Sequence, residues 1–142
     1  MGDLDQFPFT YDDARSYYFS HRKDTWLICD NNEQTLIPIG YVALFIRKRH
    51  GVGIFRIAIP EKEKQNKGHA YRATKMILNW GFDECDLRSI HLSVSSSNLH
   101  AIALYKKVGF QECGRYKNSR YEDGVVYDEI LMEFPRSLHQ TI

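Results

Sequence analysis

The sequence lacks the features of membrane, secreted and nucleic-acid-binding proteins. None of its apolar stretches approaches the ~20 residues of a membrane-spanning helix. The acidic start MGDLDQF does not resemble a secretory signal, so we expect a cytoplasmic protein. The three cysteines, Cys29, Cys85 and Cys113, form no CxxC pair, which argues against a disulfide framework and against a metal site. A formal net charge of +1 provides no general attraction to nucleic acid or to an anionic membrane.

The chain also lacks internal repeats, low-complexity tracts and linkers rich in Pro, Gly or Ser. We therefore predict a single domain over residues 1–142. The hydrophobic fraction of 43% and the charged fraction of 26% are ordinary for a globular protein. A chain of this length buries about two-thirds of its unfolded surface, so one core is expected to stabilise it.

The apolar periodicity predicts an α/β domain. Helices are indicated by apolar residues at helical spacing and by their ends, such as Asn98 as N-cap and Gly109 at the C′ position. Strands are indicated by alternation and by turn signals at RKRHG and YEDG. The predicted helices cover 11–22, 69–85 and 98–109, and the predicted strands cover 25–30, 39–48, 52–59, 89–95, 110–118 and 125–134. The expected order is helix, four strands (one beyond the three recognised runs), helix, strand, helix and hairpin.

The stretch QNKGHA, at residues 65–70, lies between a predicted strand and a predicted helix. A glycine lets the backbone approach a ligand closely, and the free N–H groups in the first turn of a helix attract anions. Lys62, Lys64 and Lys67 add positive charge. On this pattern alone a solvated turn is the better alternative, because the chain has neither the GK[ST] of a P-loop nor the second glycine of GxGxxG.

A second block changes this interpretation. The string NLHAIALYKKVGF, at residues 98–110, contains an Asn followed by ALYxKxGF, and QNKGHA matches [R/Q]xxGx[G/A] at Gln65, Gly68 and Ala70. Together the two blocks resemble the GNAT superfamily of N-acetyltransferases, over about residues 25–134. The closing segment EDGVVYDEILME resembles the branch that contains spermidine acetyltransferases and ribosomal-protein N-terminal acetyltransferases. The resemblance implies a mixed, mostly antiparallel twisted sheet flanked by helices, here shortened at the N-terminus.

The same resemblance implies how the donor is bound. It implies acetyl-CoA as co-substrate, with no metal, and it assigns the pyrophosphate to the loop that opens the helix at residue 69. The pantetheine arm would lie against the backbone of the preceding strand, where a backbone N–H can also polarise the thioester carbonyl. The implied cofactor-binding residues are Ile57, Ile59, Gln65, Asn66, Lys67, Gly68, His69, Ala70, Asn98, Tyr105 and Lys107.

Tyr105 is the implied catalytic acid, because a phenol with a pKa of about 10 can protonate a leaving thiolate. On spacing alone Tyr105 would instead be a core residue of its helix. An amine acceptor must first lose a proton, which costs roughly 4–5 kcal/mol at pH 7. The sequence identifies no base: the strand VGIFRIAI has no Glu and Ser93 occupies the other family position, which leaves His91, His50 or ordered water.

The acceptor stays open among polyamines, aminoglycoside-like small molecules and peptide or protein N-termini, each attacking directly in a ternary complex. Acidic residues are candidates for a cationic pocket, although most suit solvated turns and Asp128, inside a strand, needs a partner. They are Asp30, Glu33, Glu122, Asp123 and Asp128. The alternative function is a CoA-binding module without catalysis, which the missing Glu favours. A shortened N-terminal half would leave apolar sheet surface uncovered, which favours a homodimer.

Overall fold

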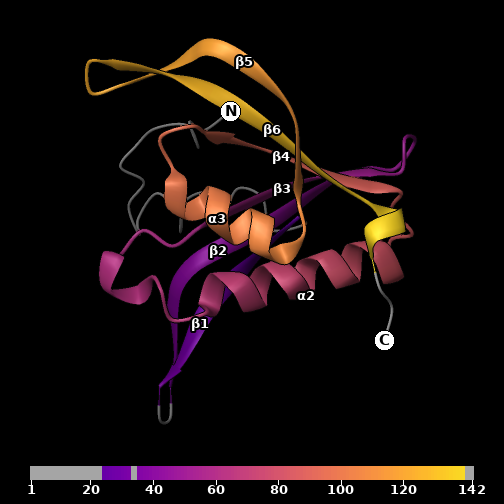
Figure 1. The fold of residues 1–142 in the computed structure, drawn as a ribbon. Coiled ribbons are helices and arrows are strands. Elements are labelled where there is room, and N and C mark those ends of the chain that lie inside the picture. Colours follow the sequence, from indigo (N-terminus) through magenta and orange to yellow (C-terminus); the bar gives the residue numbers. More distant parts are fainter. Residues whose placement is uncertain (1–23, 33–34, 140–142) are drawn as a thin grey trace.

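The structure, a computed structural model, describes residues 24–32 and 35–139 (Figure 1). Its strands are β1 Thr25–Asn32, β2 Thr35–Arg47, β3 Val52–Ala58, β4 Ser89–Ser95, β5 Gln111–Glu122 and β6 Val125–Pro135. Its α-helices are α2 His69–Asp83 and α3 Leu99–Val108, and its short 3-10 helices are η1 Lys62–Lys64 and η2 Arg136–Leu138. The predicted helix over 11–22 lies outside the described residues.

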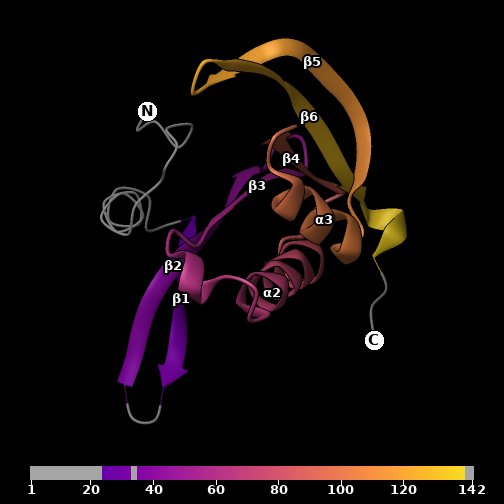
Figure 2. The ribbon, with the colours of Figure 1, turned by 60° about the vertical axis from the view of Figure 1, so that its left-hand side comes forward.

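The six described strands form one mixed sheet in the order β1-β2-β3-β4-β6-β5. β3 and β4 are parallel and are connected through α2, whereas the other neighbouring strands are antiparallel. Both helices pack on one face of the sheet, where they lie side by side (Figure 2). This arrangement confirms the predicted mixed, mostly antiparallel sheet. No helix among residues 24–32 and 35–139 is long and apolar enough to cross a membrane.

Apolar periodicity explains which faces are buried. In β4 the side chains of Ile90, Leu92 and Val94 are buried, because alternate residues of a strand face the same side. In α2 the buried residues recur at three- and four-residue steps, as expected for a helix with one apolar face. They are Thr74, Ile77, Leu78, Gly81 and Phe82. The predicted faces of both elements therefore meet in one core.

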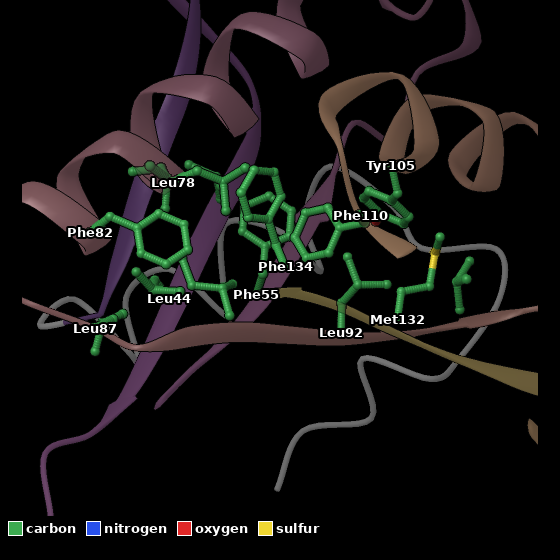
Figure 3. Close-up of a cluster of buried hydrophobic side chains, with 14 of the residues drawn as sticks. Leu44, Phe55, Leu78, Phe82, Leu87, Leu92, Tyr105, Phe110, Met132 and Phe134 are labelled. Carbon is green, nitrogen blue, oxygen red and sulfur yellow. The ribbon is translucent and has the colours of Figure 1, made fainter. Parts of the chain in front are cut away.

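An aromatic cluster connects the helices to the sheet (Figure 3). The ring centroid of Phe110 lies 5.8 Å from that of Tyr105, 6.2 Å from Phe55 and 5.6 Å from Phe134. Phe134 in turn lies 5.6 Å from Phe82 of α2. The predicted packing of Phe110 back onto its helix is confirmed, and it ties α3 to β3 and β6.

Some element bounds differ from the prediction. β2 begins at Thr35 rather than at residue 39, so it runs through Pro38. A proline is tolerated there because this part of β2 pairs with β1 and not with β3. β5 continues to Glu122 rather than ending at 118, across an irregular stretch in which Asn118 has a φ of 53°. In the described residues three strands precede α2, not the expected four.

The β5–β6 connection is a two-residue hairpin. Asp123 has a φ of 48° and Gly124 a φ of 82°. Positive φ at both central positions defines the type I′ turn, whose twist matches the flanking strands. The turn predicted at YEDG is confirmed.

Candidate active site

β3 and β4 separate part of the way along the sheet. They are paired over three residues, ending at Ile54 opposite His91. Beyond this point β3 stays paired to β2 as far as Ala58, and β4 stays paired to β6 as far as Ser95. Among the described strands, none therefore lies between the facing edges of β3 and β4. Such an open edge can hold an extended ligand through main-chain hydrogen bonds.

The backbone of β3 presents hydrogen-bonding groups to this gap. Just before the strand, the carbonyl of Gly51 accepts from the N–H of Arg88 at 2.7 Å, on the β4 side. Because backbone groups alternate sides along a strand, those of Ile57 point toward the same side. The carbonyl of Ile59, just beyond β3, instead accepts from Nε2 of Gln65 at 2.7 Å. Gln65 thus fastens the loop to the end of β3.

The loop leads into a helix N-terminus that has no side-chain cap. Gly68 is the N-cap of α2 with a φ of 82°, and Asn66 has a φ of 61°. Left-handed residues in such a turn direct successive N–H groups toward one concave side. The first intrahelical bond runs from the N–H of Arg72 to the carbonyl of Gly68 at 3.0 Å. The three N–H groups before it have no helical acceptor, so this end of α2 can receive an anion.

Cationic side chains surround this N-terminus. Lys67 is exposed in the loop. Nη2 of Arg72 lies 3.1 Å from Nδ1 of His69 and 3.5 Å from the carbonyl oxygen of Lys67. A Cβ on Gly68 would lie 2.7 Å from Nη1 of Arg72, so the guanidinium lies directly over the turn. Sequence reasoning missed Arg72, although its position one helical turn after Gly68 was an available signal.

The last turn of α3 brings Lys107 to the same region. Its Nζ lies 4.7 Å from the ring centroid of Tyr71, in the first turn of α2, and Nζ of Lys75 lies 6.0 Å from the same ring. Sequence reasoning placed Lys107 at the site but missed Tyr71. Uncapped N–H groups, a glycine turn and several cations fit a pyrophosphate, so the residues present suit a CoA-type donor.

Tyr105 lies on the sheet side of α3. Its ring packs edge-on against Phe55, with centroids 6.3 Å apart, and it is 7% exposed. Burial raises the pKa of its hydroxyl well above the usual value, so the phenol stays protonated. Tyr105 therefore lies between α3 and β3 with its hydroxyl protonated.

Asn98 begins the helix that carries Tyr105. Its Oδ1 accepts from the N–H of Ala101 at 3.1 Å, which confirms the predicted N-cap. The rest of the exposed Asn98 side chain faces solvent beside the end of β4. Gly109 ends the helix with a φ of 129°, as expected for a residue at a helix C-terminus.

The structure places both histidines considered as bases away from Tyr105. His50 is in the turn before β3, at the opposite end of that strand from Ile57, and its carbonyl accepts from Arg88. His91 alternates with the buried Ile90, so it faces the side of the sheet away from the helices. No group of His, Cys, Asp or Glu among the described residues is placed to hold a metal ion.

The acidic candidates among the described residues have separate partners. Asp30 lies 3.7 Å from Lys64 as an ion pair, and Glu33 lies outside the described residues. Asp128 has the partners its strand position required: its Oδ1 accepts from the N–H of Asn118 at 3.0 Å, with Lys117 also near. That N–H, helped by neighbouring cations, lowers the pKa of Asp128. Asp128 is thus structural.

Glu122 differs from the other acids, because it is held at the end of β4. Its Oε2 accepts from Oγ of Ser95 at 2.7 Å, and its Oε1 accepts from Oγ of Ser97 at 2.7 Å. Burial alone would raise the pKa of Glu122, but the hydrogen bonds from Ser97 and Ser95 and the charge of Arg120 outweigh it and lower the pKa. The side chain is therefore an ordered, ionised carboxylate.

Comparison with known proteins gives the site its context. The model of the Acetyltransferase (GNAT) family matches residues 3–110. A spermidine N(1)-acetyltransferase of Escherichia coli K12 is 31% identical over 104 residues, which are 73% of this chain and 53% of that protein. The Vibrio cholerae spermidine N(1)-acetyltransferase is 31% identical over 127 residues, 80% of this chain and 69% of that protein. The chain thus spans about half the length of the Escherichia coli relative.

Solved structures agree with this likeness. The Vibrio cholerae spermidine N-acetyltransferase in complex with CoA and spermine superposes with a TM-score of 0.70 at 27% identity, over 90% of this chain and 76% of that one. An F149A mutant of the Vibrio cholerae enzyme superposes with a TM-score of 0.73 at 28% identity, with the same shares. A GNAT-family acetyltransferase of Bacillus anthracis, at 19% identity, shares the fold with a TM-score of 0.75.

Proposed function

The chain belongs to the GNAT acetyltransferase family, and we propose that it transfers an acetyl group from acetyl-CoA to a primary amine. The observation that carries this proposal is the open edge of β3 leading to the uncapped N-terminus of α2. An extended arm with a pyrophosphate at one end matches both features at once. The family's use of acetyl-CoA and the complex of a relative with CoA support this donor.

The residues of this chain have separate tasks in donor binding. The loop around Gly68 and the first turn of α2 receive the pyrophosphate, with Lys67 and Arg72 as counter-charges. The backbone of Ile57 binds the pantetheine arm in the manner of an added strand. Bound acetyl-CoA supplies the activated acyl group as a thioester. Each charge-assisted contact contributes roughly 1.5–3 kcal/mol, so a few such contacts hold the donor firmly.

Tyr105 is the acid of the reaction. Its buried phenol holds a proton at the hydroxyl oxygen because burial disfavours the phenolate. A thiol has a pKa of about 8.5, below that of the buried phenol, so the hydroxyl stabilises a leaving thiolate by donating a hydrogen bond to it as the intermediate collapses. We assign the step that frees the amine of its proton to ordered water, because His50 lies before β3 and His91 lies opposite Ile54, where β3 and β4 are still paired.

The acceptor is an amine of the polyamine class. The curated relatives are spermidine N(1)-acetyltransferases, and one solved relative is described in complex with spermine. A polyamine offers a primary amine for acetylation and further cationic nitrogens for recognition. Aminoglycosides and peptide N-termini share the primary amine but not the linear polycation.

A thiol-release assay tests the proposed function. Acetyl-CoA is offered with spermidine, spermine, an aminoglycoside and a peptide with a free N-terminus, and released CoA is measured. We expect release with the polyamines. CoA binding without release for any acceptor would instead identify the chain as a CoA-binding module that has lost catalysis, the function favoured by the absence of a Glu from β3.

We also propose that the chain self-associates. A solved structure of the Vibrio cholerae spermidine N-acetyltransferase is described as dodecameric. In this chain β5 is an edge strand with exposed aromatic side chains at Tyr116 and Tyr121. Sedimentation of the purified protein should show a dimer or a larger assembly, and a monomer at all concentrations would refute it.

A further inference from the structure

A carboxylate is fixed where the two separating strands end. Besides the bonds that Ser95 and Ser97 donate to Glu122, the hydroxyl oxygens of the two serines lie 2.8 Å apart. The cluster of Glu122, Ser95 and Ser97 connects the end of β5, the end of β4 and the turn before α3. This contact is formed because the β5–β6 hairpin curves over β4 and α3 (Figure 2).

The register of the parallel strands places this cluster at the mouth of the gap. Ile54 on β3 and His91 on β4 are the last pair between these strands. Four residues further along, β3 ends at Ala58 and β4 ends at Ser95. At about 3.3 Å per residue, both ends lie about 13 Å beyond that pair. Glu122 therefore lies across the gap from the part of β3 that carries Ile57.

Glu122 and Tyr105 belong to opposite faces of this gap. Val94 packs in the core beneath the helices, so the neighbouring Ser95 points to the other face of the sheet. Tyr105 lies on the helix face, against Phe55. An amine that enters on the Glu122 side would meet the donor from the face opposite the acid, which separates the nucleophile from the leaving thiolate.

The charge of Glu122 is only partly compensated. Nε of Arg120 lies 3.9 Å from Oε2, at the outer limit of an ion pair, and the Glu122 side chain is 22% exposed. The serines donate neutral hydrogen bonds that orient the carboxylate and leave its negative charge in place. A carboxylate can accept about four hydrogen bonds, so room remains for an ammonium group.

We propose that Glu122, oriented by Ser95 and Ser97, binds a cationic nitrogen of the acceptor at the mouth of the β3–β4 gap. The inference rests on the proposed function and names the residue that selects a cationic acceptor. It assigns no proton transfer to Glu122: the nitrogen it binds is a recognition group, and the reacting amine lies deeper in the gap. A merely structural Glu122 would fasten the hairpin to β4 and would leave acceptor affinity unchanged.

Glu122→Gln separates the two roles, because the amide oxygen still accepts from a serine hydroxyl while the charge is lost. We expect the KM for spermidine, and its Kd by titration calorimetry in the presence of CoA, to rise roughly 10- to 100-fold. The KM for acetyl-CoA and the melting temperature should change little. Glu112→Gln is the matched control: it makes the same change on the same strand at a carboxylate that also accepts a hydrogen bond, from Arg115 at 2.6 Å.

Each outcome decides a different claim. Unchanged spermidine affinity in Glu122→Gln, or an equal loss in Glu112→Gln, would overturn the role of Glu122 while leaving the proposed function standing. If the wild-type protein binds spermidine without turnover, the proposed function fails and the calorimetric comparison still decides the role of Glu122. Absence of spermidine binding by the wild-type protein would overturn both.

Discussion

Replacing Gly68 by alanine tests the donor site, and the chain offers a matched control in Gly124. Both glycines have a φ of 82°. An alanine in the left-handed region costs roughly 1–2 kcal/mol, so each variant should melt roughly 3–6 °C below the wild type. At Gly124 a Cβ would have nothing within 4 Å, whereas at Gly68 it would lie 2.7 Å from Nη1 of Arg72. The two variants therefore carry a similar backbone cost and differ at the N-terminus of α2.

The difference should appear in CoA binding. In Gly68→Ala the guanidinium of Arg72 must move and the loop must shift, which weakens contacts to an anion at the first turn of α2. Loss of one charge-assisted contact, about 1.5–3 kcal/mol, raises the Kd for CoA roughly 10- to 150-fold. Gly124→Ala should bind CoA as the wild type does. Titration calorimetry with CoA and a thermal melt measure both effects, and equal CoA affinity in the two variants would refute the assigned donor site.

Three further variants test individual parts of the structure. Asn98→Ala should lower the free energy of unfolding in urea by about 1 kcal/mol, because the bond accepted from Ala101 at the N-cap is lost, and no change would contradict the cap. Phe82→Ala should lower the same quantity by about 3–5 kcal/mol, because Phe82 is 0% exposed, and a loss below about 1 kcal/mol would contradict its core position. Asp128→Asn should make the free energy of unfolding depend less on pH in acid. The N–H of Asn118 and nearby cations lower the folded pKa of Asp128. The stabilisation from Asp128 is therefore present above the unfolded pKa of about 4 and is lost as pH falls through the lower folded value. Urea unfolding across this pH range should show a steeper decline for the wild type, and identical slopes would contradict the contact.

The regular elements could be predicted because their local signals agree with the fold. β4 was predicted at its observed bounds, since Ile90 and its alternate neighbours all face the core. β2 and β5 were predicted too short because each contains an irregular residue that is tolerated only through the pairing of its strand with the neighbouring strands. Pro38 is acceptable only where β2 has one partner, and Asn118 adopts a positive φ only within the curved β5–β6 hairpin.

Local sequence patterns likewise predicted only part of the candidate site. QNKGHA indicated the proposed donor loop because a short motif fixes its backbone locally, and the structure adds that Nε2 of Gln65 donates to the carbonyl of Ile59. Arg72 could have been predicted from its position one helical turn after Gly68, whereas a single aromatic residue in a helix, such as Tyr71, has no distinctive pattern. Glu122 was considered only as one of several acidic residues, since its contact with Ser95 joins positions 27 residues apart through hairpin curvature that no periodicity encodes.

A comparison of the wild type with Tyr105→Phe tests whether the chain acetylates an amine with Tyr105 as the acid. Spermidine and saturating acetyl-CoA are given to the wild type and to Tyr105→Phe, and acetylated product is measured by mass spectrometry beside the Kd for CoA. We expect product with the wild type, and a roughly 100- to 10,000-fold lower kcat in Tyr105→Phe at unchanged CoA affinity. Equal kcat in both proteins, or CoA binding with no acetylated amine from the wild type, would contradict it.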